Sequence, residues 1–209
     1  VASAAASDSA LPWMPAPGGI AAHWQVSSAS ARALRVALDV SHMPAGAEIR
    51  FAGNASIGTV YGPVTASDIL KLGSPYWSPV LEGDTATIEV FVPGGAGRAV
   101  LAVGLVSHLF VSPSDPGAEQ LSKASGACEV DFICRAAGDA QLAQTGRSVA
   151  RMTFSTGSGG TSLCTGTLLN PSDNSFTPYF YSAAHCISTQ SVANTLTTHW
   201  FYDNTTCGG

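Results

Sequence analysis

The stretch that decides the fold is PYFYSAAHCI (178–187), an apolar run that ends in small residues, a histidine and a cysteine. The run predicts a strand over 178–185 that delivers His185 to a loop. The small residues 182–184 leave room for other strands to crowd against the turn and hold the imidazole at a surface. Three interpretations of His185 are open at this point: a catalytic base, a metal ligand and a buried structural histidine.

The sequence around this stretch, residues 128–209, predicts a β domain. Strand-like segments lie at 146–154, 162–169 and 195–202, and the loops between them are rich in Gly, Ser, Asn and Thr. Ser158 lies in the first of these loops, TGSGGT (156–161). Two glycines follow it in the sequence, but it lies between two predicted strands, where a hairpin loop is expected. We therefore do not interpret Ser158 as a nucleophile.

The N-terminal part of the chain predicts a second β domain. Strand-like alternation at 33–40, 47–53, 85–93 and 98–106, with Pro, Gly and Asp clusters between, indicates a small antiparallel β-sandwich over 23–118. Residues 1–22 are expected to form an extended N-terminal arm, and 119–127 an exposed linker. Nothing in this region has catalytic spacing, and its three histidines are expected to be structural or exposed. They are His23, His42 and His108.

The composition narrows the classes of function. The chain has 209 residues, of which 45% are hydrophobic and only 11% charged, and its net charge is −5. This balance suits an all-β extracellular protein and provides no basic surface for a nucleic-acid partner. The longest apolar stretch, 99–111, is interrupted by Gly104, Ser107 and His108 and is too short for a membrane span. No signal peptide is visible in the first residues.

All five cysteines lie after residue 127, at 128, 134, 164, 186 and 207, which marks the C-terminal part as chemically distinct. Neither C-x-x-C knuckles nor histidines at helical spacing occur, so the pattern favours disulfides in an oxidising compartment over a zinc site. An odd number of cysteines leaves at least one without a partner in this chain. We expect a secreted protein with no metal and no cofactor.

At this point the sequence resembles the chymotrypsin-like serine endopeptidases. SAAHC (182–186) is similar to their histidine signature, Thr-Ala-Ala-His-Cys, with Ser182 in the first position, and CTGTLLN (164–170) resembles the preceding strand. The bacterial lysyl endopeptidases are more similar still, with paired cysteines in SGACEVDFIC (125–134) and a last one in HWFYDNTTC (199–207). The N-terminal region resembles their propeptide in position and in YWSPVLEGDTATIEVFVP (76–93).

The resemblance implies a fold, a chemistry and a set of bonds. The fold is an N-terminal β-sandwich followed by the first, incomplete half of a chymotrypsin-like double β-barrel. His185 is the general base that activates a serine for attack on a peptide substrate. The implied disulfides are Cys134–Cys207 and Cys164–Cys186, and Cys128 pairs with a cysteine outside the chain. We weigh this against a satisfied core histidine in a disulfide-bonded β domain, which composition alone favours.

The rest of the implied catalytic machinery is not found after His185. Family members carry an orienting aspartate later in the first barrel and a nucleophilic serine in a Gly-Asp-Ser-Gly-Gly turn of the second barrel. Here Asp203 is the only acidic residue after His185, and it lies in YDNTTC (202–207), which matches the cysteine-bearing strand end. The fragment alone is therefore expected to be inactive and to need its own missing C-terminal barrel as a partner.

The linker contains a candidate processing site. Lys123 is the only basic residue in EQLSKASGACEV (119–130), a segment whose composition suits an exposed protease substrate. A lysine preference, which the resemblance implies, predicts cleavage between Lys123 and Ala124; the alternative is that Lys123 is a solvated linker residue. A competing hypothesis for the whole chain is a noncatalytic secreted binding or adhesion protein with a degenerate protease-like domain.

Overall fold

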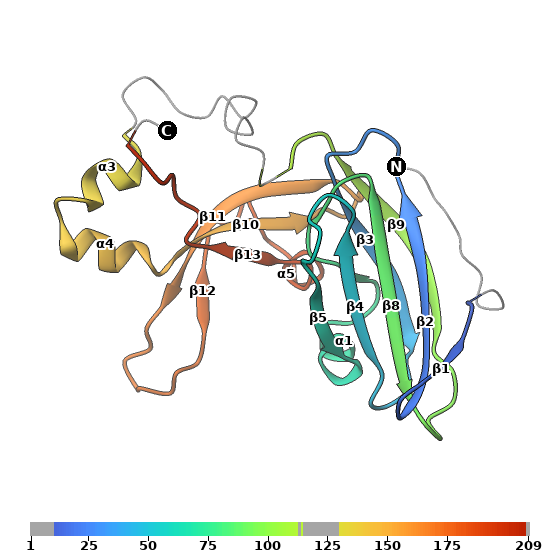
Figure 1. Ribbon diagram of the computed structural model, residues 1–209. Helices are drawn as coiled ribbons and strands as arrows, with labels where there is room; N and C mark the ends of the chain where they lie inside the picture. Colours follow the sequence, from blue (N-terminus) through green and yellow to red (C-terminus); the bar gives the residue numbers. More distant parts are fainter. Residues whose placement is uncertain (1–10, 113, 115–129, 208–209) are drawn as a thin grey trace. The chain divides into compact units, whose positions relative to one another are not determined.

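The computed structural model describes residues 11–112, 114 and 130–207. By its internal contacts the chain divides into two compact units (Figure 1). Unit 1 comprises Val1–Ala118 with Gly157–Gly160, and unit 2 comprises Glu119–Thr156 with Thr161–Gly209. The predicted linker 119–127, the processing residues Lys123 and Ala124, and Cys128 lie outside the described residues.

Unit 1 contains two antiparallel sheets. In the first, five strands follow the order β1-β2-β8-β4-β5. Their bounds are Met14–Ala16 (β1), Gly19–Ser27 (β2), Thr85–Pro93 (β8), Glu48–Gly53 (β4) and Tyr61–Thr65 (β5). In the second, β3 (Ala33–His42) pairs with β9 (Val100–Leu109) along one edge. Along its other edge it pairs with the short strands β6 (Tyr76–Trp77) and β7 (Leu81–Glu82).

The core of unit 1 is one hydrophobic cluster to which both sheets contribute. Strand β8 buries every second residue, as a strand does when only one of its faces points inward. Strand β3 supplies inward residues from the other sheet. The members on these two strands are Ala86, Ile88, Val90, Val92, Leu34, Val36, Leu38 and Val40.

A short helix, α1 (Ala66–Leu72), follows β5 in unit 1. It begins at Thr65, whose side chain accepts a hydrogen bond from the backbone N–H of Asp68 at 3.3 Å. It ends at Gly73, whose φ of 86° is a left-handed conformation that glycine adopts at no steric cost. Only Ala66 and Ile69 of this helix are buried.

Unit 2 is built on one antiparallel sheet with the strand order β12-β11-β10-β13. The strands are Tyr179–Tyr181 (β12), Thr161–Leu169 (β11), Val149–Ser155 (β10) and Thr197–Trp200 (β13). Three short helices, α3 (Phe132–Ala136), α4 (Ala140–Gly146) and α5 (Gln190–Ala193), accompany the sheet. Asp139 caps α4 and Thr189 caps α5 through their side chains.

The described part of the chain is mostly β, as the sequence predicts, but it departs from the prediction in four details. Four short helices are present, and the described strands close no barrel. Strand β1 and the start of β2 lie within the region expected to be an extended arm. Strand β12 ends at Tyr181, so the predicted strand over 178–185 is shorter than expected and His185 lies in a turn. Among the described helices, none has the length and apolar character needed to cross a membrane.

Candidate active site

Strand β11 is the platform of the candidate site. It pairs with β10 along its length, with Cys164 opposite Met152, and with β12 only at residues 167–169. Gly166 is buried on this strand beneath the ring of Phe180, which leaves no space for a side chain there. The Phe180 ring meets the Trp200 ring edge-on, with centroids 6.0 Å apart. The Phe180 side chain thereby packs over the face of the sheet and holds β12 in place just before the histidine turn.

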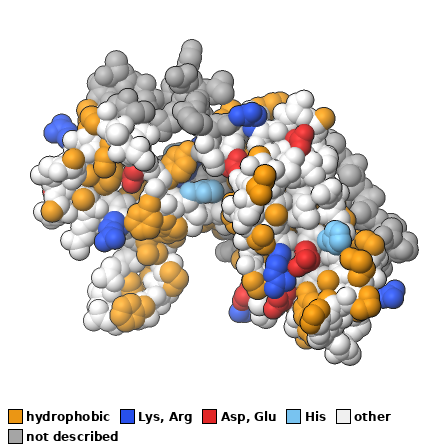
Figure 2. Space-filling model, in the orientation of Figure 1, with side chains coloured by type: hydrophobic (Ala, Val, Ile, Leu, Met, Phe, Trp, Pro, Cys, Tyr) orange, Lys and Arg blue, Asp and Glu red, His pale blue; other side chains and the backbone are white. Residues whose placement is uncertain are grey.

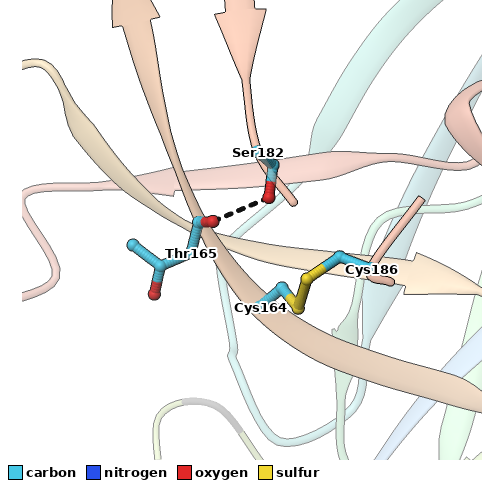
Figure 3. Close-up of a disulfide and its surroundings, with 4 residues drawn as sticks. All are labelled: Cys164, Thr165, Ser182 and Cys186. Atoms are coloured by element: carbon cyan, nitrogen blue, oxygen red, sulfur yellow. Dashed lines mark hydrogen bonds between the residues drawn. A yellow bond between two sulfur atoms is a disulfide. The ribbon is translucent and has the colours of Figure 1, made fainter. Parts of the chain in front are cut away.

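The turn that carries His185 begins with a side-chain hydrogen bond. Beyond Tyr181 the backbone ladder to β11 stops, and the Ser182 hydroxyl donates to the carbonyl oxygen of Thr165 at 2.8 Å (Figure 3). The backbone N–H groups of Cys186 and Ile187 then both donate to the carbonyl oxygen of Ala183, at 3.0 and 3.3 Å. The chain therefore turns directly after leaving the strand.

A disulfide fixes the other end of the turn. Cys186 is bonded to Cys164 on β11, with a Cα–Cα distance of 6.3 Å (Figure 3). Ser182 and Cys186 are thus attached to consecutive residues of one strand, Thr165 and Cys164. Because both ends of a five-residue segment are tied to a paired strand, the backbone around His185 has little freedom to move.

The His185 side chain itself is exposed, and among the described residues it has no hydrogen-bond or ion-pair partner. One of its ring nitrogens and the sulfur atoms of Cys164 and Cys186 all lie within 4.8 Å of one another. The two sulfurs are joined in a disulfide and offer no thiolate, so this group does not have the donors of a cysteine–histidine metal site. What remains is an accessible imidazole on an anchored backbone, and such a group can accept a proton from a neighbouring group.

The segment that follows β13 is held against α4 and β10. The Arg151 guanidinium lies 4.4 Å from the centroid of the Tyr202 ring, and that of Arg147 lies 6.0 Å from the Phe201 ring. A second disulfide, Cys134–Cys207, joins α3 to the end of this segment, with a Cα–Cα distance of 4.7 Å. Both disulfides of the described residues join the pairs that the resemblance implies.

None of the other residues considered from the sequence has a described bond to His185. Asp203 is exposed and lines a cleft of about 510 Å³ together with Arg147 and Phe201, and it makes no described bond to His185. Ser158 is exposed in the loop between β10 and β11. His23 and His42 are exposed, and His108 shares a hydrogen bond with the Ser28 hydroxyl at 2.9 Å.

Sequence reasoning missed the bond between Ser182 and Thr165. The signature position that Ser182 occupies is normally threonine, which also carries a hydroxyl. The shared hydroxyl was the feature of the sequence that could have indicated a hydrogen bond at this position. A sequence does not reveal the acceptor, because the register between β11 and β12, which brings Thr165 alongside Ser182, is not specified locally.

Comparison with known proteins relates both halves of the chain to one group. Residues 1–110 match the family described as "Lysyl endopeptidase N-terminal domain", and residues 122–209 match "Lysyl endopeptidase, C-terminal domain". The curated Lysyl endopeptidase of Pseudomonas aeruginosa is 38% identical over 208 residues, which is 95% of this chain. The chain spans 44% of the length of that relative. No solved structure matches this chain. The chain belongs to the lysyl endopeptidase family.

Proposed function

We propose that the chain is part of the precursor of a secreted serine endopeptidase that cleaves peptide bonds after lysine, with His185 as its general base. The observation that carries the proposal is the double attachment of the histidine turn to β11, through Ser182 and through Cys186. A general base must be held within hydrogen-bond reach of the proton it removes, so a fixed backbone around an exposed imidazole favours this role over a buried structural one.

The chemistry assigned to His185 is proton transfer. A serine hydroxyl is a weak nucleophile at neutral pH until a neighbouring imidazole accepts its proton. His185 would take that proton during attack on the substrate carbonyl and return it to the leaving amine. The serine and the aspartate that orients the imidazole would come from polypeptide beyond Gly209, including a second barrel.

At the level of the fold, unit 2 is proposed to be the first part of a chymotrypsin-like double β-barrel and unit 1 a sandwich-like propeptide. Large apolar side chains remain exposed on the β11–β12 hairpin, and Figure 2 shows hydrophobic side chains gathered there. They include Leu168, Leu169, Phe176, Tyr179 and Tyr181. Such a surface is consistent with cover by further protein.

In the proposed maturation of the precursor, unit 1 is removed and unit 2 is bonded to the downstream barrel. Cleavage between Lys123 and Ala124 would detach unit 1, and Cys128 would pair with a cysteine in the downstream barrel. The two disulfides of unit 2 support folding in an oxidising compartment and hence secretion.

The test is a His185→Ala variant of the complete precursor, assayed with peptides that differ only in lysine, arginine or alanine before the cleaved bond. Hydrolysis should fall by several orders of magnitude while the urea unfolding curve is retained. His23→Ala, which alters an exposed histidine of unit 1, is the control. Near-normal hydrolysis by a folded His185→Ala protein would contradict the proposal.

The competing function is a noncatalytic binding or adhesion protein with a degenerate protease-like domain. The coding frame beyond Gly209 separates the two hypotheses. An aspartate in the expected segment and a Gly-Asp-Ser-Gly-Gly turn favour the enzyme, and a substituted turn favours the binding protein. A fluorophosphonate probe should label the complete enzyme at that serine and leave the 209-residue chain unlabelled. Labelling at Ser158 would instead make that residue the nucleophile.

A further inference from the structure

Lysine is scarce and unevenly distributed in the chain. There are seven arginines but only two lysines, Lys71 and Lys123. From residue 124 to 209 there is no lysine at all. A peptidase that cuts after lysine therefore has no site in this part of unit 2, and it has one site inside unit 1 besides the linker site at Lys123.

Lys71 lies where a protease can reach it. It is in the last turn of α1, and its side chain is 75% exposed. Residues 71–75 are all exposed. The bond that follows Lys71 therefore lies within an uninterrupted exposed segment. The only ion pair of the Lys71 ammonium among the described residues is with Asp68 on the same helix, at 3.2 Å. A peptidase could bind the Lys71 side chain without first exposing it, because it is not buried in the core.

The bond after Lys71 lies in the last turn of α1, beyond the last buried residue of the helix. Peptidases bind their substrates as extended chains, so the last turn of α1 must unwind before the bond can be cut. The contacts of that turn include the Asp68–Lys71 pair and the Gly73 N–H, which donates to the carbonyl oxygen of Ile69 at 3.1 Å. Just beyond the turn, the Ser74 hydroxyl donates to the Asp39 carboxylate at 2.9 Å. The buried residues of α1 are Ala66 and Ile69, and residues 70–75 are all exposed. A seven-residue helix with an exposed last turn frays readily.

We propose that the bond between Lys71 and Leu72 is a second processing site, and that its hydrolysis by a lysine-specific peptidase disables unit 1 while unit 2 survives. The inference rests on the proposed lysine specificity of the mature enzyme. One water is consumed: the bond from the Lys71 carbonyl carbon to the Leu72 nitrogen breaks. Lys71 gains a carboxylate and Leu72 an α-amine.

The topology of unit 1 determines what this cut does. It separates the β1–β5 and α1 segment from the β6–β9 segment. Each sheet mixes the two, because β8 lies between β2 and β4, and β3 pairs with β6, β7 and β9. The pieces therefore stay paired after the cut but are no longer one molecule, and unfolding becomes irreversible on dilution. Cleavage at Lys71 commits the N-terminal unit to loss after Lys123 has been cut.

The experiment uses the 209-residue chain as substrate and adds the Pseudomonas lysyl endopeptidase under native conditions, with fragments identified by intact mass and N-terminal sequencing. Cuts are expected after Lys123 and after Lys71, the latter giving a fragment that begins at Leu72. The matched control is Lys71→Arg, which keeps the positive charge and the Asp68 pair but removes the lysine. It should abolish the second cut and leave the first.

A second variant tests the opening step. Thr65→Ala removes the side-chain cap of α1 at the end far from Lys71. Because a helix this short unfolds cooperatively, the loss of the cap should also open the last turn and speed the cut after Lys71 about fivefold. An intact Lys71–Leu72 bond in chains that are fully cut at Lys123 would overturn the proposal, as would equal cutting of the Lys71→Arg chain. An unchanged rate in Thr65→Ala would overturn the local-opening route.

These outcomes are separate from the fate of the proposed function. Because the peptidase is added, cleavage at Lys71 is read out whether or not the complete precursor is active. A complete precursor that fails to hydrolyse lysine peptides would defeat the proposed function. An active precursor whose N-terminal unit remains uncut at Lys71, with Lys123 cut, would defeat only the second processing site.

Discussion

The Ser182 hydroxyl donates a 2.8 Å hydrogen bond to the Thr165 carbonyl oxygen, and the residue before Thr165 is the cysteine that is bonded to Cys186. A five-residue segment is thus attached at its first and last residues to neighbouring positions on β11. His185 is the fourth residue of that segment. The position of its backbone is set by a paired strand, whereas its exposed ring is left to interact with groups outside the segment.

The first prediction concerns this hydrogen bond. Ser182→Ala should lower kcat of the complete enzyme about fivefold, because a lost hydrogen bond of about 1 kcal/mol loosens the turn that positions His185. KM should change little, since Ser182 acts through the turn and not on the substrate. Steady-state kinetics with a lysine peptide provide the measurement.

Ser182→Thr is the matched control, because threonine keeps the hydroxyl that donates to Thr165 and is the usual residue in the signature. It should retain most of the activity. Equal losses in Ser182→Ala and Ser182→Thr would show that the hydroxyl is not the group that matters.

The second prediction compares the two disulfides. Cys164–Cys186 closes a separation of 22 residues and Cys134–Cys207 one of 73. Chain entropy predicts that replacing each pair by alanines costs about 3 kcal/mol for the short loop and about 4 kcal/mol for the long one. Urea unfolding of each double variant measures the cost. A larger loss for the shorter loop would contradict the entropic explanation.

The same variants should separate stability from catalysis. Loss of Cys164–Cys186 frees the residue next to His185 and should reduce kcat even in buffer where the protein is fully folded. Loss of Cys134–Cys207 should leave kcat nearly unchanged under those conditions, since that bond joins α3 to the end of the β13 segment.

The strands were predictable where alternation was strong. Strand β8 spans Thr85–Pro93, the same residues as the segment predicted from sequence, because its buried and exposed positions alternate along most of its length. The helices were not predicted. α3, α4 and α5 have five, seven and four residues and bury none, so they are too short for a helical period to be detected.

The candidate site was predictable only in part, for a physical reason. The motif located His185 and suggested its neighbours, but it extended the strand over Ser182, because small residues continue the apolar run. In the structure the Ser182 side chain binds the Thr165 carbonyl in place of a backbone ladder, and the strand ends. That replacement depends on the register between β11 and β12, which local sequence does not specify.

The third prediction concerns acid. The pKa of Asp39 is lowered below its ordinary 3.8 by hydrogen bonds, first from the Ser41 hydroxyl and N–H and then from Ser74. A carboxyl whose folded pKa is depressed stabilises the fold above its unfolded pKa, and that stability is lost as pH falls through the folded value. Unit 1 should therefore lose stability below about pH 4, as measured by urea unfolding between pH 7 and pH 2.

Asp39→Asn is the informative variant. It should be less stable than the natural chain at pH 7, and the difference should shrink as the pH falls below 4, since the natural carboxylate is then protonated. Asp173→Asn serves as the comparison, because that carboxyl has a pKa lowered by Ser175 but lies in unit 2. A stability difference for Asp39→Asn that stays constant with pH would refute the assignment.

The fourth prediction concerns the packing beneath the site. A Cβ on Gly166 would lie 2.9 Å from the backbone oxygen of Tyr181 and within the contact distance of the Phe180 ring. Gly166→Ala should therefore cost about 1–3 kcal/mol, because the oxygen belongs to a paired strand and cannot move away as a flexible side chain does. Urea unfolding measures the loss, and a shifted Trp200 emission should accompany displacement of Phe180. Gly157→Ala is the control: no atom lies within 4 Å of its added Cβ, so it should be neutral or slightly stabilising. Equal stability of the two variants would mean that β12 has room to shift, and that close packing at Gly166 does not hold the strand before the His185 turn.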